Sequence, residues 1–230
     1  MGKGGNVIDK KPDKIVQRAV SLLEGKYGIP SPKPYKDPLE ELIFTILSQN
    51  TNDRNRDRAH DALCARFSNW EEVMEADPAE IAEAIKIGGL ANQKSVRIKN
   101  ILTAIHRVYG KLDLDFLKDI PLQEGIELLS SFKGVGPKTV ACVLLFACDR
   151  PIFPVDTHIF RIATRLNLLP EKCNDVKAHR IMNTLVAPEK VYSFHMNVIT
   201  LGREICKPAK PKCHICPLKD VCCFENKQTG

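Results

Sequence analysis

Four cysteines near the C-terminal end of the chain have a spacing that suits an inorganic centre. They are Cys206, Cys213, Cys216 and Cys222. The pattern C-x6-C-x2-C-x5-C places four thiol groups within seventeen residues, and four thiolates from one short segment can surround a single centre. The intervening lysines, among them Lys207, Lys210 and Lys212, would offset the negative charge of the thiolates.

Zinc and a [4Fe–4S] cluster are the two centres that such thiolates would hold. Structural zinc sites usually present two separated pairs of closely spaced ligands, and only Cys213 and Cys216 form such a pair here. Compact runs of four cysteines suit a [4Fe–4S] cluster. The spacing therefore favours iron–sulfur and leaves zinc open. Cys223 is surplus, and would replace Cys222 if the register differed by one residue. The total of nine cysteines is odd, which argues against a complete disulfide framework.

A second candidate site is the glycine-containing segment 132–139, which precedes an apolar stretch. Gly134 and Gly136 permit tight backbone geometry, and Pro137 suits the first turn of a helix. Free N–H groups at such a turn form a phosphate site without sequence preference. A nucleotide-binding P-loop is excluded, because that motif requires glycine directly before its lysine and Pro137 stands there.

Lys138 and Asp156 are the residues of this part of the chain that could act in catalysis. Lys138 would lie at a helix start, where the positive end of the dipole favours the neutral amine that a lysine nucleophile needs. For an isolated lysine in this position, a solvated contact to phosphate is the commoner role. Asp156 would begin the next helix, where an aspartate most often serves as N-cap. His158 is predicted to be structural, or to lie near the partner whose phosphates this turn would bind, rather than to be catalytic.

Helices must position all of these residues, because the apolar spacing is helical nearly throughout the chain. An early helix follows Asp13 as a plausible cap, and Asp77 and Pro78 have the form of another helix start. Later helices are predicted at 92–109, 121–131, 137–148, 156–167, 175–186 and 189–204. We find no alternating strand pattern and no long repeat, so the predicted fold class is all-α.

Composition and charge narrow the class of protein. The net charge of +6 and the pI near 8.8 suit a polyanionic partner, although many other proteins are equally basic. No apolar run approaches the roughly eighteen residues of a membrane helix. Residues 1–12 lack an apolar core and are predicted to form a flexible tail rather than a secretory signal. We therefore expect a chain that is neither secreted nor bound to a membrane.

Taken together, the motifs resemble those of endonuclease III, a family of helix-hairpin-helix DNA glycosylases. The resemblance rests on the segment 134–139, on the segment 155–158 and on the four cysteines, in that order, and it extends from about residue 13 to residue 223. It implies a two-lobed all-α fold. A six-helix barrel with the helix-hairpin-helix would occupy 30–150, and 13–29 and 151–230 would form an iron–sulfur cluster domain.

The resemblance also implies an activity, a bifunctional DNA glycosylase and AP lyase of base excision repair that removes oxidised pyrimidines. Lys138 would attack C1′ of the deoxyribose, displace the base and form a Schiff base, and β-elimination would cleave the strand 3′ to the abasic site. Asp156 would deprotonate the lysine and stabilise the cationic sugar. The partner would be double-stranded DNA containing damaged bases or abasic sites, bound by a monomer, with the target nucleotide extruded into a pocket. The cofactor would be a [4Fe–4S] cluster.

Further segments correspond to parts of the family that contact DNA. Gln49, in the segment 47–51, resembles the residue that fills the gap left by the flipped nucleotide. Leu90, in the segment 88–92, resembles a second, apolar wedge, although ordinary core packing is the commoner role of a leucine. The turn at Gly134 and Gly136 would grip a backbone phosphate. The loop lysines Lys207, Lys210 and Lys212 would also face phosphates.

Departures from the family leave the base preference open. Asn52 follows Thr51 where the family often has aspartate, and this loop also resembles the Ser-Gln-Asn loops of plant demethylating glycosylases. Mismatched uracil or thymine and methylated cytosine are therefore alternative targets, and a non-catalytic DNA-binding module is an alternative of another class. Thr45 stands where the adenine-removing branch carries glutamate, which disfavours that branch. The expected location is the cytoplasm and nucleoid of a prokaryote, or the nucleus or mitochondrion of a eukaryote.

Overall fold

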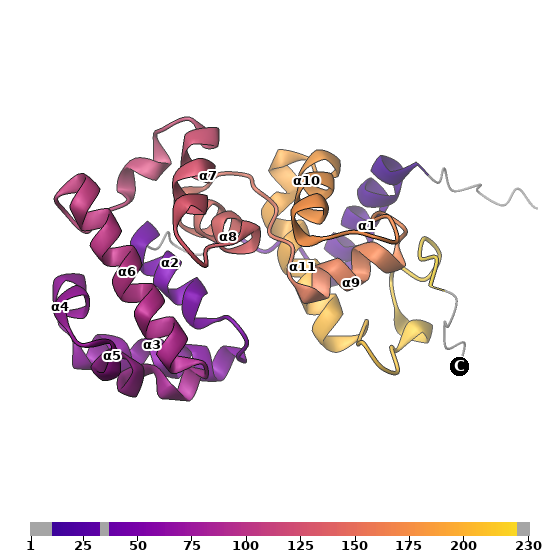
Figure 1. The fold of residues 1–230 in the computed structure, drawn as a ribbon. Coiled ribbons are helices and arrows are strands. Elements are labelled where there is room, and N and C mark those ends of the chain that lie inside the picture. Colours follow the sequence, from indigo (N-terminus) through magenta and orange to yellow (C-terminus); the bar gives the residue numbers. More distant parts are fainter. Residues whose placement is uncertain (1–10, 33–36, 225–230) are drawn as a thin grey trace, which may run out of the picture. The chain divides into compact units, whose positions relative to one another are not determined.

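The computed structural model describes residues 11–32 and 37–224 and divides the chain into two compact units (Figure 1). One unit comprises 33–150 and is called the central lobe below. The other comprises 1–32 together with 151–230 and is called the terminal lobe. Across the described residues the regular structure is helical and contains no strand, which confirms the predicted all-α class. None of these helices is both long and apolar enough to cross a membrane.

The central lobe contains seven α-helices in its described part. They are α2 (Pro38–Leu47), α3 (Asp53–Arg66), α4 (Trp70–Glu75), α5 (Pro78–Ile85), α6 (Ala91–Tyr109), α7 (Leu122–Ser131) and α8 (Pro137–Cys148). Short 3-10 helices at Lys86–Gly88 and Asp115–Lys118 precede α6 and α7. Six of the α-helices have eight or more residues, and α4 is a short addition to them.

The core of the central lobe forms around α2 and α8, which pack against each other. Leu39, Leu42, Ile43, Ile46 and Leu47 of α2 are fully buried. The helix α8 is apolar around most of its circumference, as expected for a helix that is enclosed on all sides. This burial fixes the position of the first turn of α8, where Lys138 lies.

Side-chain caps begin several of these helices where the sequence predicts them. Asp77 accepts a hydrogen bond from the Ala79 N–H and forms a capping box with Glu80, which confirms the predicted helix start. Asn52, the residue at which the loop departs from the family, caps α3 by accepting from the Asn55 N–H at 2.9 Å. The departure therefore has a local structural role.

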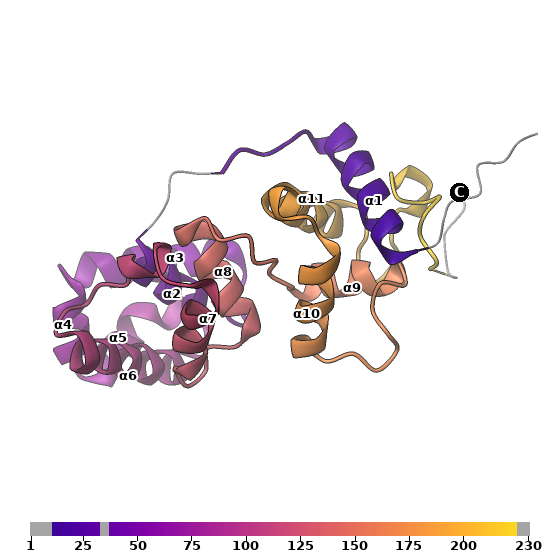
Figure 2. The ribbon, with the colours of Figure 1, turned by 90° about the horizontal axis from the view of Figure 1, so that it is seen from above.

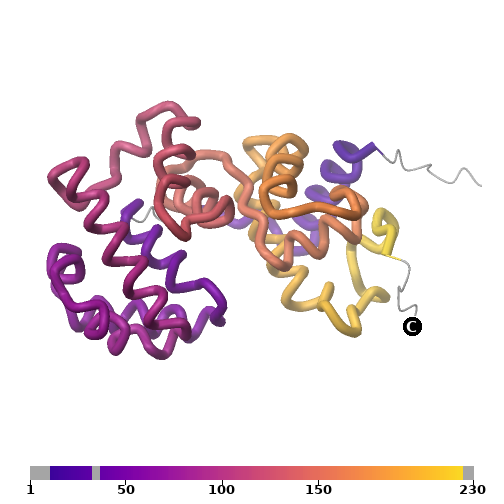
Figure 3. Tube along the Cα trace, viewed as in Figure 1, coloured from indigo at the N-terminus to yellow at the C-terminus, as the bar shows by residue number. Residues whose placement is uncertain are grey.

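The terminal lobe brings the two ends of the described chain together (Figures 2 and 3). It contains α1 (Pro12–Tyr27), α9 (Thr157–Arg165), α10 (Asp175–Leu185) and α11 (Val191–Glu204), with 3-10 helices at Pro188–Lys190 and Cys213–Ile215. Both α1 and α9 pack against α11. The lobe therefore depends on contacts between segments that are far apart in the sequence.

Several predicted helix boundaries in this lobe differ from the structure by one or two residues, and α1 and α9 show why. The helix α1 begins at Pro12 after Lys11 as N-cap, so Asp13 is an acidic residue of the first turn rather than the cap. Residues 11 and 12 thus belong to the start of a helix, and the rest of the predicted tail, 1–10, lies outside the described residues. The helix α9 ends at Arg165 rather than at 167, because Asn167 adopts a positive φ of 57°.

A buried lysine links two loops of the central lobe. Lys94 of α6 is 1% exposed, and its Nζ donates hydrogen bonds to the carbonyl oxygens of Leu47, at 2.7 Å, and Gly88, at 2.8 Å. These carbonyls lie at the C-terminal end of α2 and just before α6. Burial, with a smaller contribution from the charge of Arg97, lowers the pKa of Lys94 below its ordinary value.

Replacing Lys94 by methionine should destabilise the protein by about 2–4 kcal/mol, because two buried carbonyls lose their donor. Chemical denaturation of Lys94→Met beside the wild type measures this change. The exposed Lys86 pairs with Glu83 at 2.5 Å, and Lys86→Met serves as a control with an expected change of about 0.5 kcal/mol or less. Equal unfolding midpoints for Lys94→Met and the wild type would contradict the role assigned to these hydrogen bonds.

The lowered pKa of Lys94 also predicts a pH dependence. Between the folded-state pKa and the higher unfolded-state pKa, the unfolded chain binds more protons, so stability rises with pH in this window. The penalty for burying the charged amine is fully present below the folded-state pKa and is gone above the ordinary lysine range. The stability difference between wild type and Lys94→Met should therefore grow from neutral toward alkaline pH. A difference that shrinks over this range would contradict the assignment.

Candidate functional site

Lys138 occupies the second position of α8, after Gly136 as N-cap and Pro137 at the first helical position. Its side chain is half-buried, and it forms no hydrogen bond or ion pair with any other residue in the described ranges. The neighbouring Thr139 and Val140 are buried, so the backbone beneath Lys138 is anchored in the core. The amine is thus held at a defined place without an internal partner.

The turn between α7 and α8 has the geometry of an anion site. Gly134 has a φ of +87°, in the region that favours glycine, and the Val135 N–H donates to the Phe132 carbonyl at 3.0 Å. Within the described chain, the N–H groups of Gly134 and Gly136 have no hydrogen-bond acceptor. These two amides, together with the N-terminus of α8, are available to a phosphate.

The two glycines of this turn differ in what they require. Gly136 has an extended backbone, with φ −96° and ψ 177°, which any residue can adopt. A Cβ atom added to Gly136 would meet nothing within 4 Å. The sequence-based view that both glycines permit tight backbone geometry therefore applies to Gly134 alone in this structure. Gly136 is the N-cap of α8, and N-cap residues are normally extended.

Gln49 lies beside this turn and is held by two partners. Its Oε1 accepts a hydrogen bond from Arg97 Nη1, and its Nε2 donates to the Gly134 carbonyl at 3.5 Å. Arg97 also lies against Gly134, since a Cβ atom on that glycine would overlap the Arg97 guanidinium. Sequence reasoning missed Arg97. The available signal was its position three residues after Lys94, one helical turn away on the same side of α6.

Leu90 is exposed rather than part of the core, with 45% of its surface accessible. It adopts a positive φ of 51° at the N-cap position of α6, a conformation that costs a residue with a bulky side chain about 1–2 kcal/mol. Core packing is therefore excluded as its role. Because Lys94 bonds both Leu47 and Gly88, it fastens the loop of Leu90 to the loop of Gln49.

Asp156, in the terminal lobe, is the N-cap of α9. Its Oδ1 accepts a hydrogen bond from the Ile159 N–H at 2.8 Å. Asp156 is half-buried, and among the described residues its Oδ2 has no hydrogen-bond partner. The predicted cap is thus confirmed, and one carboxylate oxygen remains available for another contact.

Side chains from α10 and α11 hold the extended segment that leads to Asp156. The Phe153 N–H donates to Asn183 Oδ1 at 2.7 Å, and the Val155 N–H donates to His179 Nε2 at 3.0 Å. His195 Nδ1 donates to the Pro154 carbonyl at 3.1 Å. These bonds satisfy backbone groups that no helix or strand satisfies. Sequence reasoning did not identify them, because the partners lie 24 to 41 residues away.

His179 must be a neutral imidazole to make both of its bonds. Its Nδ1 lies 2.8 Å from the Asp175 carbonyl and therefore donates, which leaves Nε2 as the acceptor for Val155. His158, in contrast, contacts Arg161 through Nδ1 at 3.1 Å and packs closely against Gly202 of α11. This packing agrees with the structural role predicted for His158.

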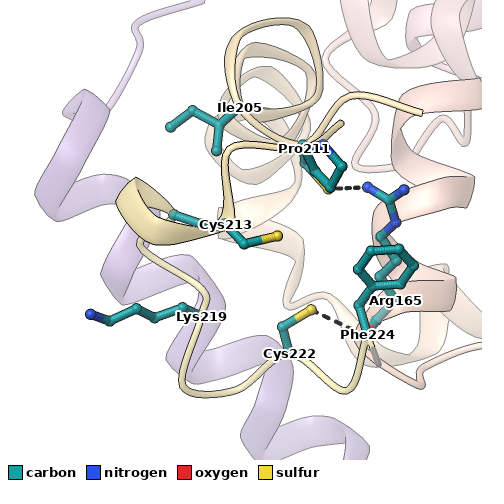
Figure 4. A pocket seen from close by; sticks show the side chains of 9 residues that line it. Arg165, Ile205, Pro211, Cys213, Lys219, Cys222 and Phe224 are labelled. Carbon is teal, nitrogen blue, oxygen red and sulfur yellow. Dashed lines mark hydrogen bonds between the residues drawn. The ribbon is translucent and has the colours of Figure 1, made fainter. Parts of the chain in front are cut away.

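The four predicted cysteine ligands line one cavity of the terminal lobe (Figure 4). The cavity is also lined by Arg165, Ile205, Pro211, Lys219 and Phe224. Figure 4 shows the sulfur atoms of Cys213 and Cys222 directed toward the same space. Cys223 is exposed and does not line the cavity, which favours the register with Cys222.

Arg165 connects this cavity to α9. Its Nη1 donates to the Sγ of Cys206 at 3.0 Å and to the Lys207 carbonyl at 2.9 Å, and its Nη2 donates to the Pro208 carbonyl at 3.1 Å. The guanidinium carbon lies 4.1 Å from the centre of the Phe224 ring. A cation at this place suits a set of thiolates.

The chemistry of the cavity fits a group that binds thiolates. Burial raises the pKa of Cys216 to about 11, with the neighbouring Cys206, Cys222 and Cys213 contributing to the rise and a hydrogen bond with the Leu218 backbone opposing it, so a thiolate there needs a cationic centre. Across the described residues, no three His, Cys, Asp or Glu side chains are arranged to hold a metal ion. Four zinc-bound sulfurs would approach one another to about 3.8 Å, whereas a cuboidal cluster binds each thiolate at a different iron.

The half-buried Tyr27 lies near these cysteines. Its hydroxyl oxygen is buried, and Glu204 and Cys216 are the ionisable side chains close to it. Burial, followed by the charges of Glu204 and Cys216, raises its pKa to about 12. The hydroxyl is thus a proton donor near a proposed thiolate ligand. The loop lysines Lys207, Lys210 and Lys212 are exposed.

The structure thus forms two clusters of predicted residues, one in each lobe. In the central lobe, Lys94 and Arg97 of α6 link the loops of Gln49, Leu90 and Gly134. The same lobe contains Lys138. Asp156 and the four cysteines belong to the terminal lobe.

Comparisons with known proteins agree with this arrangement. A model of the HhH-GPD superfamily of base excision DNA repair proteins matches residues 43–188. The Arabidopsis thaliana protein named "Putative DNA glycosylase At3g47830" is 40% identical over 189 residues, which cover 78% of this chain and 64% of that protein. The chain thus spans less than two thirds of that relative. Endonuclease III of Thermotoga maritima is 31% identical over 193 residues, which cover 84% of this chain and 85% of the relative.

The fold is also found in a solved structure of an endonuclease III bound to DNA without a covalent bond. It matches with a TM-score of 0.78 and 22% identity, over 91% of this chain and 94% of the other. The fold, the order of the motifs and these matches lead to one conclusion: the chain belongs to the HhH-GPD superfamily of base excision DNA repair proteins, and within it to the endonuclease III family.

Proposed function

We propose that this protein is a bifunctional DNA glycosylase and AP lyase that excises oxidised pyrimidines from duplex DNA. The observation that carries the proposal is Lys138, whose amine has no partner in the described residues and lies directly after a turn with free backbone amides. Binding phosphate would require the amides but not a partnerless amine on an anchored helix. The lysine is therefore assigned to covalent chemistry.

The reaction follows from the groups available. The Lys138 Nζ attacks C1′ of the deoxyribose, the bond from C1′ to the base breaks, and the base leaves with a proton. The sugar ring opens to a Schiff base between Nζ and C1′. Loss of a proton from C2′ then expels the 3′ phosphate by β-elimination, and water hydrolyses the Schiff base. Asp156 accepts a proton from the Lys138 ammonium and stabilises the positive charge that develops on the sugar.

DNA binding is assigned to the loops of the central lobe. The amides of Gly134 and Gly136 bind a backbone phosphate, while Gln49 and Leu90 enter the base stack where the target nucleotide leaves it. The exposed side chain and left-handed backbone of Leu90 support this role, because such a conformation persists only where something else requires it. The loop lysines Lys207, Lys210 and Lys212 contact phosphates from the terminal lobe.

The proposed cofactor is a [4Fe–4S] cluster bound by the four cysteines that line the cavity. Cys206, Cys213, Cys216 and Cys222 hold it, and Arg165 donates to the Sγ of Cys206 beside it. When bound, the cluster supplies the cross-link that fixes the loop of the terminal lobe. The lining of one cavity by all four cysteines, with Arg165 donating to the Sγ of Cys206, supports this assignment.

Borohydride trapping tests the activity and its substrate class. Matched duplexes would carry thymine glycol, 5-hydroxycytosine, uracil opposite guanine, or thymine opposite guanine. We expect a covalent protein–DNA complex on the duplexes with oxidised bases. Trapping on the mismatches alone would keep the lysine chemistry and move the protein to the mismatch branch. No trapping on any duplex, with binding intact, would favour a DNA-binding module.

Replacing Lys138 by glutamine should remove both trapping and strand cleavage, because the amide cannot form a Schiff base. The affinity for a duplex with a stable abasic analogue should change by about three-fold or less, since only one charge is lost. Lys111→Gln, at an exposed position of the same lobe, is the matched control and should keep full activity. Strand cleavage retained by Lys138→Gln would refute the assignment of the nucleophile.

Asp156→Asn separates the catalytic role of Asp156 from its structural role. Asparagine caps helices about as well as aspartate, so the unfolding midpoint should be nearly unchanged. Base excision should fall by about a hundred-fold or more, because the carboxylate charge and its proton acceptor are lost. Single-turnover excision and thermal unfolding of the same preparation give the two readouts. Normal excision in a fully folded variant would assign Asp156 to capping alone.

The cofactor assignment predicts about four iron atoms and four sulfides per chain, in protein purified without oxygen, and a brown colour. Elemental analysis together with the visible spectrum checks this. Cys216→Ser should lose most of the iron, whereas Cys223→Ser should keep it, because Cys223 lies outside the cavity. A colourless protein with one zinc per chain would overturn the assignment.

A further inference from the structure

Arg97 is a residue that none of the proposed steps uses, although it contacts two parts of the DNA-facing surface. It lies in the second turn of α6, where its guanidinium bonds to Gln49 and covers Gly134. In the described chain it forms no ion pair with a carboxylate. Partly burying a cation without an acidic partner costs desolvation free energy. This cost indicates that Arg97 has a role other than packing.

The position of Arg97 is tightly defined. Lys94, three residues earlier on the same helix, is fixed by its bonds to Leu47 and Gly88. On the other side Gly134 leaves room for the guanidinium only because it has no side chain. The charge of Arg97 also lies close enough to Lys94 to contribute to lowering its pKa. The backbone of α6 and the surface of Gly134 therefore hold the guanidinium from both sides.

The two partners of Gln49 define which way its side-chain amide faces. An arginine can only donate hydrogen bonds, so the atom that faces Arg97 must be Oε1. The Gly134 carbonyl can only accept, so the atom that faces it must be Nε2. Both contacts demand the same orientation, which removes the usual uncertainty between the two ends of an amide. One lone pair of Oε1 and one N–H of Nε2 remain for another partner, in a fixed order.

We propose that Arg97 is a positioning residue that orients the Gln49 amide and thereby determines which base is preferred opposite the lesion. The inference rests on the proposed function, in which Gln49 enters the space left by the flipped nucleotide. When the amide is held in one orientation, its free acceptor and free donor occupy fixed positions. Such a glutamine recognises a base edge that has a donor opposite the acceptor and an acceptor opposite the donor. Without Arg97 only the long contact of 3.5 Å to the Gly134 carbonyl holds the amide, so the amide can turn by half a rotation and both orders become accessible.

The test measures the affinity for duplexes with a tetrahydrofuran abasic analogue opposite each of the four bases, and for an undamaged duplex. For the wild type we expect the four affinities to spread by about ten-fold or more, since one bidentate contact discriminates by that amount. Arg97→Met should reduce the spread to about three-fold or less. The affinity for undamaged DNA should fall only as far as one lost charge requires.

Arg107→Met is the matched control, because Arg107 is an exposed arginine near the C-terminal end of α6. It removes the same charge from the same helix and should keep the full spread. Arg97→Lys keeps the charge but lacks the planar guanidinium, and it should also reduce the spread. This second variant provides the measurement if Arg97→Met does not fold, which thermal unfolding shows directly.

A double-mutant cycle separates an effect through Gln49 from a direct effect on DNA. In a Gln49→Ala background, Arg97→Met should cause no further change in the four affinities. A further fall equal to that in the wild-type background would overturn the proposal, and so would a full spread in both Arg97 variants. A wild type that prefers the abasic duplexes but shows no spread would overturn this inference alone. A wild type without preference for abasic over undamaged DNA would overturn the proposed function as well.

Discussion

The arrangement of the central lobe depends on the buried ammonium group of Lys94. Two carbonyls that no helix can satisfy, at the end of α2 and just before α6, both accept from it. A polar group left unsatisfied at such a place would cost about 1–3 kcal/mol, and a lysine with 1% exposure satisfies two of them at once. These two hydrogen bonds therefore fix the positions of Gln49, which follows α2, and of Leu90, which precedes α6. Arg97 of α6 contacts both Gln49 and Gly134 and so links the turn at Gly134 to them.

The terminal lobe solves the same problem with neutral side chains. The segment before Asp156 has extended backbone, and its N–H and carbonyl groups would be unsatisfied in the interior. Asn183, His179 and His195 supply their partners. Because the segment is held in this way, the carboxylate of Asp156 starts α9 from a fixed point and needs only one oxygen for the cap. In both lobes the residues assigned to DNA contact or chemistry lie on loops or at the start of a helix, and buried polar side chains hold the neighbouring loops in place.

The sequence predicts what depends on neighbours in the chain. The helices, the cap at Asp77 and the turn at Gly134 follow from local periods and residue types, and the structure bears them out. Lys94, Arg97, Arg165 and His179 were not predicted, because each acts on a partner that only the fold brings near. Leu90 is a residue whose type alone predicts the wrong environment. Its residue type favours the core, and only its exposure and positive φ reveal another role. The roles of Lys138 and Asp156 in catalysis remain proposals.

The cysteine segment illustrates why a loop of this kind needs a centre. Between 206 and 222 the hydrogen bonds among backbone groups are short-range, such as those from Cys216 to Cys213 and from Val221 to Leu218. Few of its side chains are buried, chiefly Pro211, Leu218 and Val221. Such a segment buries too little apolar surface to offset the entropy of ordering it. Arg165 contributes by bonding three groups of the segment, including the Sγ of Cys206. In the proposed function, the [4Fe–4S] cluster bound by the four cysteines would supply the remaining constraint, and the chemistry of these residues would then be part of the fold.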